Sequence, residues 1–327
     1  MIKVAVLMGG RSGEHDISLL SGEAVLGALG AGYAAEAVLL ERDGTWCFGG
    51  ERLSPGRGLA ELERRRPDVV FPALHGPMDE DGTVQAALLL LGIPFVGSGV
   101  AASAAAMDKP LTKHVFRGVG VPVAADVTVD REEWRRDAAG VCARVAAQVG
   151  LPVFVKPARL GSSVGVHRVT SADSLAAALD DCVGRHGVAL AESLLVGREL
   201  TAPVLEDPAT GEPQALPLIE IRPLMGHAFF DYTAKYTDGH NEELCPAPLD
   251  AATTAAVQAL GLAAHRAMGC RGMSRTDFIL TERGPVALEI NTIPGLTRES
   301  LIPKAAAAAG LTFPELIDRL IRCALRG

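Results

Sequence analysis

The sequence lacks several features that would mark its class. Its six cysteines are scattered, with no CxxC pair and no metal-ligand spacing, so neither a disulfide framework nor a zinc site is predicted. Basic residues are not in excess: the net charge is -8, which argues against nucleic acid and anionic membranes as partners. No export signal, internal repeat or low-complexity tail is visible. These absences favour a cytoplasmic, reducing environment and a small-molecule substrate.

One long uncharged run, residues 86–107, has enough length to cross a membrane. It contains Gly92, Pro94, Gly97 and Gly99, which break the helix that a membrane span requires. We therefore interpret the run as a helix, a short buried strand, a loop and the start of another helix.

The first hundred residues alternate between apolar strands and helices. The predicted elements are strands at 3–8, 35–40 and 68–74 and helices at 18–29 and 83–91. Such alternation predicts an open α/β sheet, in which ligands bind at the carboxyl ends of the strands. The loops at residues 9–16 and 75–82 therefore become candidate site loops.

The rest of the chain changes pattern twice. Residues from about 107 to 192 are typical of a small α+β unit, with a helix at 137–149 and strands at 153–156 and 164–169. Beyond residue 192 the chain is rich in strands. The predicted features there are strands at 199–205 and 215–221, a polar stretch at 227–243, a helix and a final hairpin.

The final hairpin predicts a metal site. Residues 275–280 and 286–291 alternate across a turn at 282–284. If the pairing is symmetric about Arg283, Asp277 lies opposite Glu289. Arg275 then lies opposite Asn291, and all four side chains share one face. Facing carboxylates repel unless a cation sits between them, and oxygen ligands suit magnesium. The alternative is a solvent-facing polar stripe.

A second set of residues suggests a phosphate site. Lys156 ends an apolar strand, and the loop Gly161-Ser162-Ser163-Val164-Gly165 follows it. Neither a Walker A motif nor GxGxxG is present. A lysine at a strand end can instead keep its charge in solvent, and this alternative applies to Lys156 and also to Lys109.

Taken in order, eight motifs spread over nearly the whole chain resemble those of the D-alanine:D-alanine ligases. The motifs are Gly9-Gly10-Arg11-Ser12-Gly13-Glu14-His15-Asp16-Ile17-Ser18, His75-Gly76, Glu80-Asp81-Gly82, Met107-Asp108-Lys109, Lys156-Pro157, Gly161-Ser162-Ser163-Val164-Gly165, Ala234-Lys235-Tyr236 and Glu289-Ile290-Asn291-Thr292. The resemblance implies a three-domain ATP-grasp fold of mixed α/β and α+β class. We expect domain boundaries at 1–105, 106–192 and 193–327.

The resemblance also implies how ATP and metal bind. Lys109 and Lys156 would meet the phosphates of the co-substrate ATP, under a loop that includes Gly161 and Ser163. Glu192 and Glu199 would approach the adenine edge and the ribose. Two Mg²⁺ ions, with Mn²⁺ as a substitute, would be held by three residues. These are Asp277, Glu289 and Asn291.

At the substrate end, the resemblance implies that Glu14 binds the ammonium of the first D-alanine, with His75 nearby. Arg275 would steady the developing oxyanion. The carboxylate of the second D-alanine would reach a turn and helix start formed by Gly295, Ser300 and Leu301. Lys235 and Tyr236 would belong to a lid, whose tyrosine bonds to Ser162.

The implied reaction is ligation of two D-alanines through an acyl phosphate, by a homodimer. Two positions depart from the family pattern: Asp79 stands where glycine is usual, and Ser193 where lysine often follows the hinge glutamate. Two alternatives stay open. One is a ligase that makes D-alanyl-D-lactate, D-alanyl-D-serine or a natural-product amide, and the other is a nucleotide-binding regulatory or scaffold protein that has lost catalysis.

Overall fold

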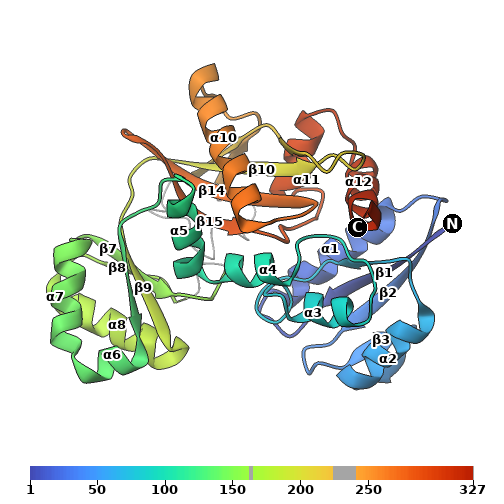
Figure 1. Ribbon diagram of the computed structural model, residues 1–327, viewed down its shortest axis with the longest axis horizontal. Coiled ribbons are helices and arrows are strands. Elements are labelled where there is room, and N and C mark those ends of the chain that lie inside the picture. Colours follow the sequence, from blue (N-terminus) through green and yellow to red (C-terminus); the bar gives the residue numbers. More distant parts are fainter. Residues whose placement is uncertain (162–164, 224–240, 327) are drawn as a thin grey trace.

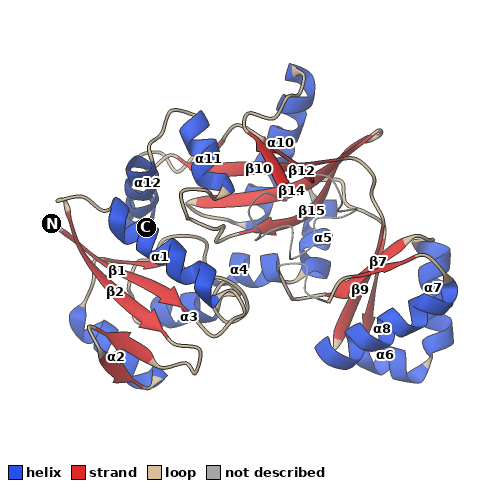
Figure 2. Ribbon diagram, turned by 180° about the vertical axis from the view of Figure 1, so that it is seen from behind, coloured by secondary structure: helices blue, strands red, loops and turns tan. Residues whose placement is uncertain are grey.

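The computed structural model describes residues 1–161, 165–223 and 241–326, which form three β-sheets and the helices around them (Figure 1). The three sheets are built from successive parts of the chain. The first and last sheets lie next to each other, and the smaller central sheet lies at one end of the molecule (Figures 1 and 2).

The first sheet has the order β4-β3-β2-β1-β5. Its strands are β1 (Ile2–Gly9), β2 (Tyr33–Leu40), β3 (Trp46–Phe48), β4 (Glu51–Leu53) and β5 (Val69–Pro72). β1 pairs in parallel with both β2 and β5, as expected for an open α/β sheet. The hairpin β3–β4 was not predicted, because strands of three residues are too short to show an alternating pattern.

Helices cover both faces of this sheet. They are α1 (His15–Ala28), α2 (Pro55–Arg65), α3 (Thr83–Leu90) and, from the end of the chain, α12 (Phe313–Arg326); the preceding helix α11 (Leu301–Ala308) packs on α12 and on the last sheet. Val4 and Val6 pack in one core with α12, whereas Ala5 and Leu7 pack in another with α2 and α3. The alternation of β1 side chains thus gives the C-terminal helix α12 an apolar face of the N-terminal sheet to pack on.

The central sheet has the order β6-β9-β7-β8, with all neighbours antiparallel. Its strands are β6 (Asp126–Asp130), β7 (Val153–Pro157), β8 (His167–Val169) and β9 (Val188–Ser193). One face packs on helices: α6 (Arg131–Arg136), α7 (Ala138–Gln148) and α8 (Ala172–His186). The strand predicted at 164–169 begins later, at His167, and residue 164 lies outside the described ranges.

The third sheet has the order β13-β12-β10-β14-β15, and β11 pairs with β10. Its strands are β10 (Arg198–Glu206), β11 (Pro213–Ala215), β12 (Ile219–Pro223), β13 (Asn241–Leu244), β14 (Met273–Thr281) and β15 (Gly284–Asn291). The single strand predicted at 215–221 is wrong. Pro217, which has no N–H to donate, falls in the break between β11 and β12.

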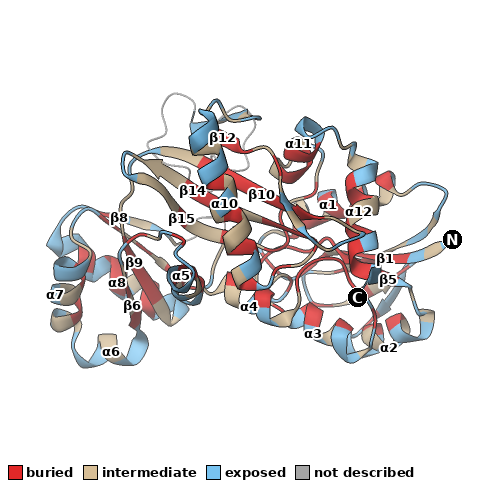
Figure 3. Ribbon diagram, turned by 45° about the horizontal axis from the view of Figure 1, so that its top comes forward, coloured by how far each residue is buried: buried red, intermediate tan, exposed pale blue. Residues whose placement is uncertain are grey.

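Three helices pack on the third sheet. They are α4 (Val100–Met107), α5 (Lys109–Gly118) and α10 (Ala251–Met268). Buried residues run along the central strands of the sheet (Figure 3). The run at residues 86–107 forms the end of α3, a bridge from Phe95 to Val70, and α4, as predicted. Within the described part of the chain, no helix is long and apolar enough to span a membrane.

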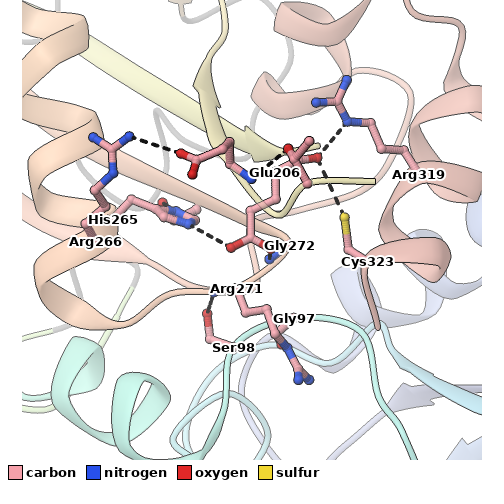
Figure 4. A network of polar contacts seen from close by, with 12 residues as sticks. Gly97, Ser98, Glu206, His265, Arg266, Arg271, Gly272, Arg319 and Cys323 are labelled. Atoms are coloured by element: carbon pink, nitrogen blue, oxygen red, sulfur yellow. Dashed lines mark hydrogen bonds and ion pairs between the residues drawn. The ribbon is translucent and has the colours of Figure 1, made fainter. Parts of the chain in front are cut away.

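A polar network fixes the start of β14 against the N-terminal part of the chain (Figure 4). Arg271 donates from its backbone N–H to Ser98 Oγ (3.1 Å) and from Nε to the carbonyl of Gly97 (3.2 Å). Gly272 N–H donates to Glu206 Oε2 (2.9 Å) at the end of β10. These bonds hold in register the strand that carries the predicted metal face.

Candidate active site

The hairpin β14–β15 pairs as predicted where it carries charge. Asp277 lies opposite Glu289, and Arg275 lies opposite Asn291. The turn differs from the prediction, because the ladder continues to Thr281 and Gly284 and leaves only residues 282–283 as the turn. A bulge between Asp277 and Phe278 leaves one residue of β15 unpaired. The bulge thereby restores the predicted register for Asp277 and Arg275.

The charged face of the hairpin is paired and largely buried. Arg275 donates from Nε and Nη2 to the two carboxylate oxygens of Asp277, each at 2.9 Å. Thr201 on β10 donates to Asp277 Oδ1 (2.6 Å). Glu289 Oε2 lies 3.2 Å from Lys109 Nζ. Asp277 is only 7% exposed, so the alternative of a solvent-facing polar stripe is wrong for this residue.

A cavity of about 530 Å³ joins this face to the two N-terminal loops. Most of the site residues predicted from the sequence line it. They are Glu14, His75, Lys109, Gly161, Glu199, Arg275, Asp277, Glu289, Asn291, Gly295, Ser300 and Leu301. Residues from both ends of the chain therefore meet at one cavity of a size that suits small ligands.

On the N-terminal wall, hydrogen bonds hold the two candidate loops together. Ser12 Oγ donates to the carbonyl of His75 (2.5 Å) and accepts from Glu14 N–H (3.1 Å). The His75 ring lies between Ser21 Oγ (3.1 Å from Nε2) and the carbonyl of Ile293 (3.1 Å from Nδ1). Burial lowers the pKa of His75, so its imidazole is neutral at pH 7.

A helix start forms another part of the cavity lining. Ser300 is the N-cap residue of α11, and its Oγ lies 2.8 Å from Thr297 Oγ1 and accepts from Thr297 N–H (3.1 Å). The first N–H groups of a helix have no partners within the helix and attract anions. This end of the cavity therefore suits a carboxylate.

Lys156 and Glu192 do not line the cavity. Glu192 forms ion pairs with Lys156 and with Lys113 Nζ (2.9 Å), and the Lys113 side chain is only 1% exposed. Burial opposes the charge on Glu192, but the two lysines hold its pKa below the usual value. Lys156 has a 12% exposed side chain, so the alternative of a strand-end lysine with its charge in solvent is wrong.

Four predicted residues lie outside the described ranges. They are Ser162, Ser163, Lys235 and Tyr236.

Several residues that line or support the cavity were not predicted. Glu80 lines it and belongs to a quoted motif, but its type alone gave no role. Lys304 also lines the cavity and pairs with Glu243 (2.8 Å). Its lining position could have been predicted, because Lys304 lies one helical turn (i,i+4) after Ser300. Lys113 follows Lys109 at the same spacing. Thr201 could be found only once the pairing of β10 with β14 was known.

The residues of the hairpin fit a divalent cation. Within the described ranges, no group of three or more His, Cys, Asp or Glu forms a metal cluster, so a metal here depends on two carboxylates and one amide. Asp277, Glu289 and Asn291 supply hard oxygen donors on one face of the hairpin. The donor chemistry favours Mg²⁺ over a thiophilic metal.

Comparisons with known proteins agree with this geometry. The family model described as D-ala D-ala ligase N-terminus matches residues 3–56 and 54–98, and the D-ala D-ala ligase C-terminus model matches residues 115–322. A protein from Herminiimonas arsenicoxydans named D-alanine–D-alanine ligase is 42% identical over 326 residues, which are 98% of this chain and 91% of that protein.

Two solved structures are similar over nearly the whole chain. The D-alanine-D-alanine ligase from Coxiella burnetii has a TM-score of 0.82 and 30% identity, covering 99% of this chain and 94% of that one. The VanG D-Ala:D-Ser ligase from Enterococcus faecalis has a TM-score of 0.82 and 31% identity, covering 98% of each chain. The fold is thus the ATP-grasp fold, whose ligases use ATP and a divalent metal. The chain belongs to the D-alanine–D-alanine ligase family.

Proposed function

We propose that this protein is an ADP-forming ligase that joins two D-alanine molecules into D-alanyl-D-alanine and so supplies peptidoglycan synthesis. The observation that carries the proposal is the single cavity at which the charged hairpin face, the Glu14 and His75 loops and the start of α11 meet. A ligase of this kind must bring a phosphoryl donor and two amino acids to one water-poor site.

At the ATP end, Lys109 would meet the phosphates, with Lys156 and the loop of Gly161 and Ser163 close to them. Lys109 now pairs with Glu289 at 3.2 Å, so it would exchange this partner for phosphate oxygens. Glu199 lines the cavity and would meet the ribose. The backbone of β9 at Glu192 would approach the adenine, because the Glu192 carboxylate is held between Lys113 and Lys156.

Asp277, Glu289 and Asn291 would hold two Mg²⁺ ions, with Mn²⁺ as a substitute. When bound, these ions neutralise charge on the transferring phosphoryl group. Arg275 and Thr201 keep the Asp277 carboxylate oriented through bonds of 2.9 and 2.6 Å.

In the first step, a carboxylate oxygen of the first D-alanine attacks the γ-phosphorus of ATP, and ADP leaves. Glu14 would hold the ammonium of that molecule, with His75 beside it. In the second step the neutral amine of the other D-alanine attacks the acyl carbon, the bond from that carbon to the phosphate oxygen breaks, and the proton lost by the amine leaves with the phosphate as hydrogen phosphate. Arg275 would stabilise the oxyanion of the tetrahedral intermediate.

The second D-alanine would bind by its carboxylate near Gly295, Ser300 and Leu301. The N–H groups of the first two residues of α11, which have no acceptor within the helix, and the Ser300 hydroxyl support this role. Lys235 and Tyr236 would act as a lid that excludes water, with Tyr236 bonded to Ser162.

Three further proposals concern the whole protein. We assign domains at 1–105, 106–192 and 193–327, in line with the three separate sheets. We expect a homodimer, which light scattering of the purified protein would measure. We also expect a cytoplasmic enzyme, because peptidoglycan precursors and ATP are both made there.

The choice of second substrate needs its own test, because one similar structure is a D-Ala:D-Ser ligase. By resemblance, Ala234-Lys235-Tyr236 favours the plain dipeptide. The enzyme is incubated with ATP, Mg²⁺, D-alanine and an equal concentration of D-serine or D-lactate, at mildly acidic and mildly basic pH. Mass spectrometry then measures each product.

We expect D-alanyl-D-alanine to dominate, with little or no depsipeptide, because closure of the lid assembles the site only around a fitting substrate. D-alanyl-D-serine or depsipeptide equal to the dipeptide under both conditions would overturn the assignment of the second substrate. No ADP formation with any D-amino acid would overturn the proposed function itself.

A further inference from the structure

Asp79 is a buried acid in the loop at residues 75–82, at a position where the family usually has glycine. It is 3% exposed, and its Oδ2 atom has no hydrogen-bond partner within the described ranges. It does not line the cavity, so it cannot touch a substrate there directly. A buried carboxylate with an unfilled acceptor lowers stability, whereas glycine would carry no such cost.

The Asp79 carboxylate lies against the glycine turn that follows β1. Gly10 has φ +96°, and a β-carbon built there would overlap Asp79 Oδ2. The absence of a side chain at Gly10 is therefore what allows the carboxylate to reach the backbone of this turn. The turn leads within four residues to Glu14.

The surroundings of Asp79 decide its charge. Burial raises the pKa of Asp79 to about 7, against the backbone N–H groups of Ser12 and Arg11, which lower it. The Arg11 guanidinium lowers this pKa as well, and Asp81 on the same loop raises it. From α3, the neutral amide of Gln85 donates to the backbone carbonyl of Asp79 (3.2 Å). Two N–H groups of the glycine turn are thus the natural partners of an ionised Asp79.

We propose that Asp79 is a positioning residue for the first D-amino acid: its carboxylate holds the glycine turn through the N–H groups of Arg11 and Ser12, and so fixes Glu14. The inference rests on the proposed role of Glu14. The bond from Ser12 Oγ to His75 already joins the same two loops, and Asp79 adds a second, charged link between them. An ionised carboxylate accepts hydrogen bonds more strongly than a neutral one.

The test compares wild type with Asp79→Asn and Asp79→Gly, and with Glu63→Gln as a control that removes an exposed acid from α2. Initial rates over a range of D-alanine concentrations give separate KM values for the two subsites, between about pH 6 and 8. Hydrogen exchange of the peptide covering residues 9–16 reports the turn without any dependence on activity.

We expect the first-subsite KM of both Asp79 variants to rise about tenfold at pH 8. Their kcat, second-subsite KM and ATP KM should stay within about twofold. In wild type the first-subsite KM should fall as pH rises through about 7, and in Asp79→Asn this dependence should vanish. Both variants should show faster exchange in the turn and a higher melting temperature at pH 8.

Higher stability with unchanged KM and unchanged exchange would overturn the proposal, since Asp79 would then be only a strained buried acid. A changed KM without faster exchange would overturn it too, because Asp79 would act otherwise than through the turn. A Glu14→Gln variant separates failure of the Asp79 proposal from failure of the proposed function. If that variant keeps the wild-type first-subsite KM, the role of Glu14 is wrong, whatever Asp79 does to the exchange rate.

Discussion

Two walls of the cavity carry acids in opposite electrostatic settings. On the hairpin wall, Asp277 and Glu289 each have a cationic partner within 3.2 Å. On the loop wall, neither Glu80 nor its buried neighbour Asp79, which does not itself line the cavity, forms an ion pair within the described part of the chain. Burial raises the pKa of Asp79 to about 7 and that of Glu80 to about 8.

The presence or absence of a cationic partner determines whether an acid of the cavity can bind a metal or instead lowers stability. A paired carboxylate stays ionised and can exchange its partner for a metal or a ligand at little desolvation cost. An unpaired acid that is buried, as Asp79 is, or half-buried, as Glu80 is, lowers stability when it ionises. Its charge also adds to the negative potential near Glu14, whose own charge raises the pKa of Glu80. Loss of an acid should therefore reduce turnover on the hairpin wall and increase stability at alkaline pH on the loop wall.

The largest expected effect is a loss of turnover when an acid of the hairpin wall is neutralised. Glu289→Gln should lower kcat about a thousandfold, because a neutral amide holds a divalent cation poorly next to phosphates. Folding should survive, since the Glu289 side chain is 29% exposed. The measurement is Mg²⁺-dependent phosphate release from ATP and D-alanine.

Glu282→Gln is the matched control, because it makes the same change in the exposed turn of the same hairpin. It should keep wild-type kcat. Turnover of Glu289→Gln within about threefold of wild type would contradict the metal-binding role of this face.

The next effect concerns a paired acid away from the cavity. Lys113→Met removes one of the two cations around Glu192 and should cost about 3 kcal/mol of unfolding free energy, because a buried carboxylate loses part of its compensation. Its ATP KM should change less than about threefold, since Glu192 keeps Lys156. Urea unfolding and ATP titration of the rate measure the two quantities.

Lys3→Met serves as the control, because the Lys3 side chain is exposed. Lys156→Met should lose stability and also raise the ATP KM about tenfold, if its ammonium meets phosphate. Equal ATP KM values in the Lys113 and Lys156 variants would remove the distinction between a supporting lysine and a phosphate-binding one.

The charged face of the hairpin was predictable because side chains in a strand alternate with period two. An assumed register was enough to place four residues on one face: Arg275, Asp277, Glu289 and Asn291. The predicted turn was wrong, but the bulge after Asp277 restores the predicted register at these residues. Local patterns of this kind do not depend on the rest of the fold.

Long-range contacts were not predictable in the same way. Nothing in the pattern of α12 indicates that it covers the first sheet, whose strands lie between residues 2 and 72. The partners of Glu192 depend on how close α5, which packs on the third sheet, comes to β9 of the central sheet. The burial of Asp79 depends on the close approach of two loops, so its sequence position suggested only a departure from the family and not its cause.

The smallest expected effect is a pH-dependent gain of stability when an acid of the loop wall is neutralised. Glu80 has a folded-state pKa of about 8, above its ordinary value of 4.5, so its contribution to stability is full below about pH 4.5 and is lost as pH rises through 8. Glu80→Gln should therefore match wild type at pH 5 and be more stable at pH 8.5. We expect a gain of only about 1–2 kcal/mol, because Glu80 is half-buried and solvent in the cavity screens its charge.

Urea unfolding of wild type, Glu80→Gln and the Glu63→Gln control at several pH values measures this gain. Asp79 still ionises in the Glu80 variant, so part of the wild-type loss of stability between pH 5 and 8 should persist there. A gain that is the same at pH 5 and pH 8.5 would mean that Gln packs better, independently of charge. In that case the loop wall would not differ from the hairpin wall in the way its acids ionise.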